Sequence, residues 1–162
     1  MSHLLTREIA QRAVEFVLPA IQRLIETKVL KRGDLHIVIA QPFVPDNVKE
    51  SFWYEKGILY EHSLGDPEKW EYPFKKIARS KCYLSWRYGM STQMLQVRAP
   101  HLLGSDSTIY YGSAVSDGLA VACSGVQPYF DQMISGWVLE ACRALCIQGR
   151  EALGEGKDGF VS

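Results

Sequence analysis

The stretch at residues 110–130, YYGSAVSDGLAVACSGVQPYF, decides the fold that this sequence predicts. Two short apolar runs flank Ser116-Asp117-Gly118, and Asp and Gly tolerate the positive φ that a hairpin turn demands. The second run ends in Ser124-Gly125 and leads into a long helical pattern. We therefore expect a β-hairpin with strands over 107–115 and 119–126, followed by a helix that starts at Gln127 or Pro128.

Apolar periodicity predicts a helix and a strand near the N-terminus. Thr6 can cap a helix whose apolar residues recur at three- and four-residue steps. Pro19 should kink this helix, and the basic residues before Gly33 should close it. The nearly continuous apolar run at 35–40 then predicts a buried strand.

The middle of the chain predicts further strand and two helical segments. Aromatic and β-branched residues at 52–54 and 57–62 are typical of strand. A second helix should begin between residues 70 and 73 and end at Tyr88, before Gly89. Residues 92–103 predict a short helix or an ordered loop.

This order of elements predicts one α+β domain over residues 1–153, with a flexible C-terminal tail at 154–162. Strands joined by tight turns pair antiparallel. Helices before, between and after the strands would then cover one antiparallel β-sheet. A chain of 162 residues is long enough for one such core.

Composition excludes several classes of function. Eighteen basic and eighteen acidic side chains cancel, so we expect neither a nucleic-acid partner nor a membrane partner. No apolar run is long enough to span a bilayer, and the N-terminus lacks the residue order of a signal peptide. The four cysteines form no C-x-x-C pair, which indicates a reducing compartment, and we expect a cytoplasmic protein.

Two motifs resemble the GlcG/HbpS-like family, also called the haem-degrading domain or PduO C-terminal-like family. The first motif, KCYLSWRYGMST at residues 81–92, is similar to the family's Lys-Ala, small residues and Phe-Gly with a nearby Thr. The second, GSAVSDGLAVACSG at 112–125, looks like the family's glycine-rich hairpin with its Asp-Gly turn. Asp131 lies where members often have Gln-Asp. The resemblance covers most of residues 5–152.

The resemblance implies a profilin-like layered sandwich, a homo-oligomer and a small-molecule pocket that binds haem in some members. It places a lysine at Lys81, whose ammonium would meet a ligand carboxylate, although a lysine on an apolar helix face also commonly snorkels to the surface. Ser124-Gly125 offers backbone N–H groups at a helix N-terminus for an acidic group, although helix capping alone also explains this pair. The ligand-binding residues implied are Lys81, Met90, Thr92, Gly112, Asp117, Ser124 and Gly125.

Metal and haem ligands do not stand out. His36 alternates with apolar residues and is expected to be a hydrogen-bonded core residue, and the family's ligand histidines have no counterpart at matching positions. Cys142 and Cys146 share a helix face but have no neighbouring histidine, so we expect core packing rather than a metal site. The aromatic residues between 52 and 74 form either a lid over a flat ligand or a core or subunit contact.

The sequence carries no nucleophile elbow, P-loop or dinucleotide-binding glycine motif. Three hypotheses therefore remain. The chain is a small-molecule-binding module for haem or another flat carboxylated ligand, an oligomeric interaction scaffold with no ligand, or an enzyme. An enzyme would need a polar pocket that holds a base with a perturbed pKa.

Overall fold

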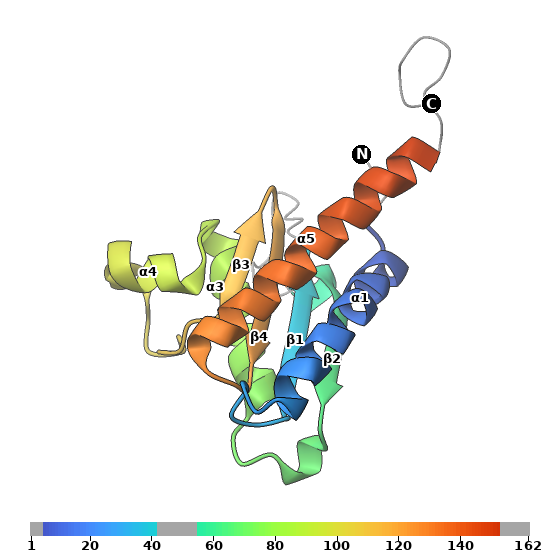
Figure 1. Cartoon of the computed structure of the whole chain (residues 1–162). Helices are drawn as coiled ribbons and strands as arrows, with labels where there is room; N and C mark the ends of the chain where they lie inside the picture. The colour runs from blue at the N-terminus through green and yellow to red at the C-terminus, as the bar shows by residue number, and fades with distance from the viewer. Residues whose placement is uncertain (1–4, 42–54, 153–162) are drawn as a thin grey trace.

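The computed structural model describes residues 5–41 and 55–152, and the α+β prediction is confirmed there. Within these residues one antiparallel sheet has the strand order β2-β1-β4-β3 (Figure 1). The elements in chain order are α1 (Arg7–Glu26), β1 (Leu35–Ala40), β2 (Ile58–Leu64), the 3-10 turn η1 (Pro67–Lys69), α3 (Phe74–Tyr88), α4 (Thr92–Arg98), the 3-10 turn η2 (Pro100–Leu102), β3 (Ser113–Ser116), β4 (Leu119–Ser124) and α5 (Pro128–Ala152).

Helix α1 begins as predicted but ends earlier than predicted. The Thr6 hydroxyl accepts a hydrogen bond from the Ile9 N–H at 3.3 Å, which caps the first turn. At the other end Lys28 adopts a φ of 60°, and the N–H groups of Lys28 and Val29 return to the carbonyls of Ile25 and Leu24. This left-handed closure ends the helix before the predicted stop at Gly33.

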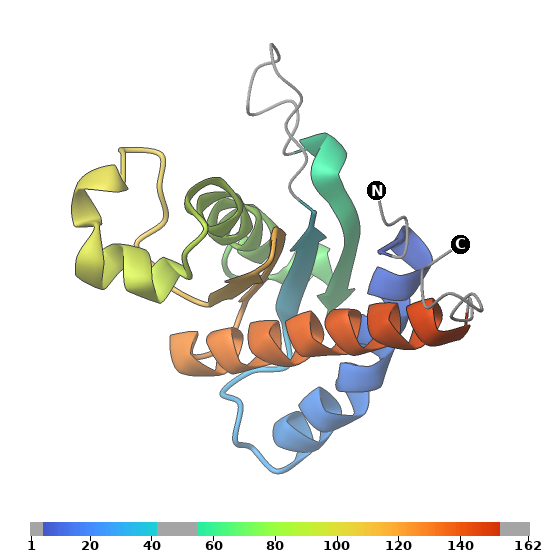
Figure 2. The ribbon, with the colours of Figure 1, turned by 90° about the horizontal axis from the view of Figure 1, so that it is seen from above.

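The two faces of the sheet are covered by different helices. Figure 2 shows α1 and α5 on one face and α3 on the other. Strand β1 is buried on both faces, so its sequence is apolar almost without alternation. Ile37 and Ile39 of β1, with Val121 of β4, pack toward α1 and α5.

The contact between α3 and the sheet includes several small residues beside the larger Val38 of β1 and Trp86 of α3. Ala40, Ala120 and Ala122 meet Ala78 and Cys82 of α3 in a second buried cluster. The Cys82 sulfur lies 3.6 Å from the Ala120 carbonyl oxygen. Small side chains on both sides let α3 approach the sheet closely, and this fixes where its polar residues lie.

The predicted hairpin is confirmed, but its strands are shorter than expected. Asp117 and Gly118 have φ values of 51° and 80°, as a type I′ turn requires. Gly112 and Gly125, with φ values of 141° and 148°, lie just outside the paired segments. Positive φ at both positions interrupts extended backbone, which is why the strands do not cover 107–112 or reach residue 126.

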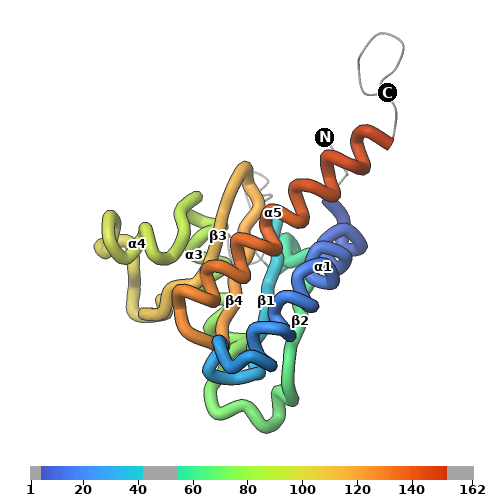
Figure 3. The backbone as a smooth tube through the Cα atoms, in the orientation of Figure 1, coloured from blue at the N-terminus to red at the C-terminus, as the bar shows by residue number. Residues whose placement is uncertain are grey.

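The segment between α3 and β3 forms a lobe at the β3 side of the molecule (Figure 3). Its short helix α4 and the turn η2 confirm the prediction for residues 92–103. Leu95 and Ala99 pack with Leu84 of α3 in a small separate cluster.

Some predictions fall outside the described residues. These are the strand at 52–54 with Trp53 and Tyr54, and the tail at 154–162. Among the helices that the structure describes, none has the length and apolar character needed to cross a membrane.

Candidate functional site

Lys81 lies in a buried ion pair at the junction of α3, β4 and α5. Its Nζ lies 3.1 Å from Asp131 Oδ2 and donates to the Cys123 carbonyl oxygen at 2.9 Å. The two side chains are only 1% and 3% exposed. Lys81 therefore does not snorkel to the surface, although this is the commoner behaviour for such a lysine.

Asp131 connects this ion pair to the start of α5. Its Oδ1 accepts from the Val126 N–H at 3.2 Å, so the strand-to-helix junction already holds a carboxylate from its own chain. Burial raises the pKa of Asp131 to about 6, although Lys81 and the hydrogen bonds act in the opposite direction. The pair is thus poorly hydrated and carries a carboxyl group that titrates near neutral pH.

Gly112 makes this arrangement sterically possible. A Cβ at position 112 would lie 2.5 Å from Asp131 Cβ and 3.0 Å from Lys81 Nζ. The Gly112 backbone is hydrogen-bonded through both of its polar groups. The N–H donates to Thr92 Oγ1 at 3.0 Å, and the carbonyl accepts from Ser135 Oγ at 3.2 Å. A residue without a side chain is required here.

A buried cluster of hydroxyl groups holds the segment behind Gly112. Ser113 Oγ lies 2.7 Å from Ser85 Oγ and 2.8 Å from Thr92 Oγ1, and it accepts from the Thr92 N–H at 2.9 Å. These bonds join α3, α4 and β3. They make Thr92 a support for the site rather than a group open to a ligand.

A cavity of about 270 Å³ opens beside the buried ion pair. Arg32 forms part of its wall, with its guanidinium carbon 5.4 Å from the Tyr72 ring centre and 5.5 Å from that of Phe74. Among the described residues no carboxylate pairs with Arg32. The wall comprises Arg32, Tyr72, Phe74, Ile77, Lys81, Tyr110, Ser124, Gly125, Val126, Pro128 and Asp131.

The structure brings together some of the predicted binding residues. Lys81, Ser124 and Gly125 line the cavity, and Gly112 lies directly behind Lys81. Gly125 also serves packing, because a Cβ there would lie 2.5 Å from Leu35 Cα.

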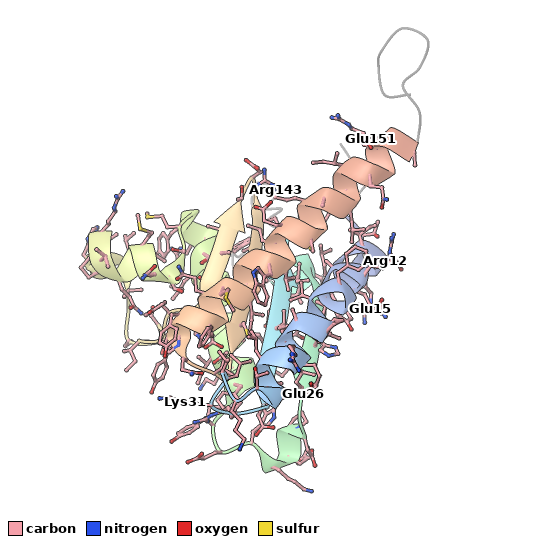
Figure 4. The ribbon with its side chains drawn as sticks, in the orientation of Figure 1. Arg12, Glu15, Glu26, Lys31, Arg143 and Glu151 are labelled. Atoms are coloured by element: carbon pink, nitrogen blue, oxygen red, sulfur yellow. The ribbon has the colours of Figure 1, made fainter. Side chains whose placement is uncertain are left out.

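Two of the predicted residues lie elsewhere. Met90 packs against the small cluster around Leu95. Asp117 is at the hairpin tip, at the opposite end of β4 from Ser124, where its Oδ2 lies 3.5 Å from Nη2 of Arg143 (labelled in Figure 4). Neither side chain lines the cavity.

Sequence reasoning missed most of the cavity wall. The sequence predicts Arg32 in the last turn of a helix, whereas α1 ends at Glu26 and Arg32 lies over Tyr72 and Phe74. The aromatic cluster at 52–74 was a usable signal, because two of its members form this wall. The position of Tyr110 could not be inferred, since it depends on the backbone after η2.

The described residues contain no group of histidine, cysteine or acidic side chains that could hold a metal ion. His36 is hydrogen-bonded in the core, as predicted. Cys142 is buried and Cys146 partly buried, and both are free thiols.

Comparison of the chain with protein-family models, with curated proteins and with solved structures finds no match.

Proposed function

We propose that the protein binds a small, flat, carboxylated molecule in the cavity beside Lys81 and Arg32. The observation that carries this proposal is Arg32, a cation stacked on two aromatic rings with no carboxylate partner among the described residues. Such a platform accommodates an apolar ring and leaves guanidinium N–H groups for a carboxylate. Lys81 contributes indirectly, because Asp131 and the Cys123 carbonyl already occupy its ammonium.

The size of the cavity favours a ligand smaller than haem. Ligand sites for drug-sized molecules span roughly 300–1,000 Å³, and this cavity of about 270 Å³ lies below that range. Of the side-chain types that ligate haem iron, its described wall offers only Tyr72 and Tyr110. A single-ring carboxylate suits the wall better, and haem is the weaker candidate of the same class.

Benzoate is a suitable probe, used with ¹⁵N-labelled protein in a two-dimensional NMR titration. We expect saturable shifts at millimolar benzoate for amides near Arg32, Tyr72 and Val126. Arg32→Gln should weaken binding by about tenfold, because a charge-assisted hydrogen bond contributes about 1.5–3 kcal/mol. Arg12→Gln, on the outer side of α1 (Figure 4), should leave binding unchanged.

Haemin gives the second arm of the same experiment. A Soret shift at micromolar protein that depends on Arg32 would assign haem to the cavity. Absence of both benzoate shifts and a Soret change would contradict the binding proposal.

We also propose that the chain assembles with copies of itself. Val97 on α4 and Ile109 in the following loop are 75% and 78% exposed. They belong to one surface, because Gln96 donates to the Ile109 carbonyl at 2.7 Å. Light scattering should give an oligomer mass for the parent chain and a lower mass for Val97→Asp/Ile109→Asp, and a monomeric parent chain would refute assembly.

The state of the cysteines supports a cytoplasmic location as part of this proposal. All four are free thiols, and three are buried. This is typical of proteins from reducing compartments.

A further inference from the structure

A second polar group lies on the opposite edge of the sheet, where β1 pairs with β2. His36 and Ser63 are directly opposite in the register of the two strands. His36 Nδ1 lies 2.8 Å from Ser63 Oγ, and His36 Nε2 lies 3.1 Å from Glu61 Oε1. Glu61 and Ser63 are two residues apart on one strand, so both side chains lie on the same face and reach one imidazole.

Arg79 of α3 fixes the carboxylate in this group. Its Nε and Nη2 donate to the two Glu61 oxygens, each at 2.7 Å. Burial would raise the pKa of Glu61, but the hydrogen bonds from Arg79 and His36 outweigh it and hold the pKa at about 2. Glu61 is therefore ionised at neutral pH and can only accept hydrogen bonds.

This carboxylate determines the tautomer of His36. Because Glu61 only accepts, His36 Nε2 must carry the proton and donate it. When the imidazole is neutral, its Nδ1 has a free lone pair that can accept a hydrogen bond from the Ser63 hydroxyl. The order carboxylate, imidazole and hydroxyl is the arrangement that activates a serine in acyl-transfer enzymes.

Ser63 is accessible while its base is shielded. The serine lines an open cavity of about 670 Å³. His36 is 2% exposed, and the Trp70 ring packs edge-on against it with ring centres 6.2 Å apart. The Ser63 hydroxyl therefore faces the cavity, and little of the imidazole behind it is exposed to bulk water.

Basic residues outnumber acidic ones in the wall of this cavity, where Lys75, Lys76 and Arg79 face a single acidic residue, Glu71. Lys75 and Lys76 are exposed residues of the first turn of α3, and no side chain caps that turn. Lysine ammonium groups beside uncapped backbone N–H groups favour an anionic substrate.

We propose that Ser63 is the nucleophile of an acyl-transfer site that hydrolyses small esters or thioesters carrying an anionic group. His36 is the general base and Glu61 the positioning residue that sets its tautomer. Its cavity shares Tyr72 with the Arg32 cavity, but Ser63, His36 and Glu61 lie outside the wall of the Arg32 cavity, so the labelling test does not depend on ligand binding there.

The reaction balances with water as the only co-reactant. Ser63 Oγ bonds to the acyl carbon as its proton moves to His36 Nδ1. The carbon–oxygen or carbon–sulfur bond to the leaving group then breaks, and the leaving group takes the proton from Nδ1. Water next attacks the acyl carbon and gives a proton to Nδ1, the Ser63 ester bond breaks, and the serine oxygen regains the proton.

A fluorophosphonate probe tests the nucleophile directly. Its phosphorus bonds to an activated serine oxygen with loss of fluoride. We expect one adduct on the parent chain by intact mass, mapped to Ser63 by peptide sequencing. Ser63→Ala should abolish the adduct. Ser116→Ala should not change it, because Ser116 is a half-buried serine whose hydroxyl contacts Asp117 and Arg143 and, among the described residues, no histidine.

Glu61→Gln tests the role of the carboxylate. The new amide can donate to Nε2, which would move the ring proton to Nδ1 and remove the base. We expect about 100-fold slower labelling of Ser63, the low end of the contribution of a general base. Histidine ¹⁵N shifts should show Nε2 protonated in the parent chain and Nδ1 protonated in the variant.

If Ser63, His36, Glu61 and Arg79 only join α3 to the sheet, the probe should not label Ser63. An unlabelled parent chain, or labelling at another serine, would overturn the proposal. Unchanged labelling in Ser63→Ala would do the same. Peptide mapping of the parent chain decides the question even if a variant fails to fold.

Discussion

Lys81 and Asp131 form a buried ion pair, and each charge is stabilised mainly by the opposite charge of its partner. Lys81→Met keeps the apolar stem but leaves Asp131 without its cation. We expect a loss of about 3–5 kcal/mol in the free energy of unfolding, the usual cost of breaking a buried pair. Urea denaturation measures it.

Lys69→Met is the matched control for this substitution. Lys69 is 83% exposed and lies 3.9 Å from Asp66, so its pair contributes about 0–1 kcal/mol. If Lys81→Met costs no more than Lys69→Met, the pair does not stabilise the fold. Replacing both partners by apolar residues, as Lys81→Met/Asp131→Leu, should recover part of the loss.

The pH dependence of stability reports the same carboxyl group. Burial raises the pKa of Asp131 from 3.8 to about 6 in the folded protein. The folded state therefore binds this proton more tightly than the unfolded state does. The resulting stabilisation is fully present below pH 3.8 and is lost as the pH rises through 6.

Asp131→Asn removes this dependence. The free energy of unfolding of the parent chain minus that of Asp131→Asn should fall by up to roughly 3 kcal/mol from pH 4 to pH 7, because only the parent chain loses the stabilisation from this carboxyl group. Parallel urea denaturation across this range checks it, and groups common to both proteins cancel. A difference that grows with pH would mean that the ion pair, and not burial, controls the carboxyl group.

At the residue scale, sequence indicated Lys81 but not its environment. The motif placed a lysine on the apolar side of a helix, and two outcomes were open. The structure shows the buried outcome. The sequence could not predict it, because Asp131 and the Cys123 carbonyl lie 50 and 42 positions after Lys81, and no local pattern encodes contacts between residues so far apart. Arg32 was missed for the related reason that its helix ends early.

Among the elements, the β3–β4 hairpin offers a comparison between two glycines with positive φ. Gly112 has no space for a Cβ, whereas nothing lies within 4 Å of one at Gly118. Gly118→Ala should cost about 1 kcal/mol, from backbone conformation alone. Gly112→Ala should cost at least about 2 kcal/mol more, because Lys81 and Asp131 must shift. Thermal and urea denaturation of the two variants checks this order, and equal losses would contradict the crowding seen at residue 112.

The hairpin also shows what element prediction can achieve. Asp117-Gly118 predicted the turn, because two positive φ values in sequence leave few residue types. The strand ends were not predicted. Apolar residues continue beyond Gly112 and Gly125 in the sequence, but the extended backbone conformation ends at these two glycines. Because these strand ends position the cavity, the sequence could not predict the geometry of the cavity even where it indicated some of the lining residues.

In the whole molecule, the order of strands in the sheet follows from tertiary packing. The α+β class was predictable from the order of elements. The pairing of β1 with both β2 and β4 was not, and neither was the register that sets His36 opposite Ser63. Those residues are 27 positions apart, and Ser63 has no sequence motif around it.

The layered arrangement predicts a gradient of local stability. Strands β1 and β4 are fully buried and paired on both sides, so their amides should exchange with solvent only through global unfolding. Helix α4 has seven residues and is anchored through a small cluster, so its amides should exchange through local opening. Hydrogen-exchange mass spectrometry should give the slowest rates for peptides from β1 and β4 and rates at least tenfold faster for α4. Equal protection of α4 and β1 would mean that the lobe and the sheet unfold as one unit, and the hydroxyl cluster around Ser113, which joins them, would then be the cause.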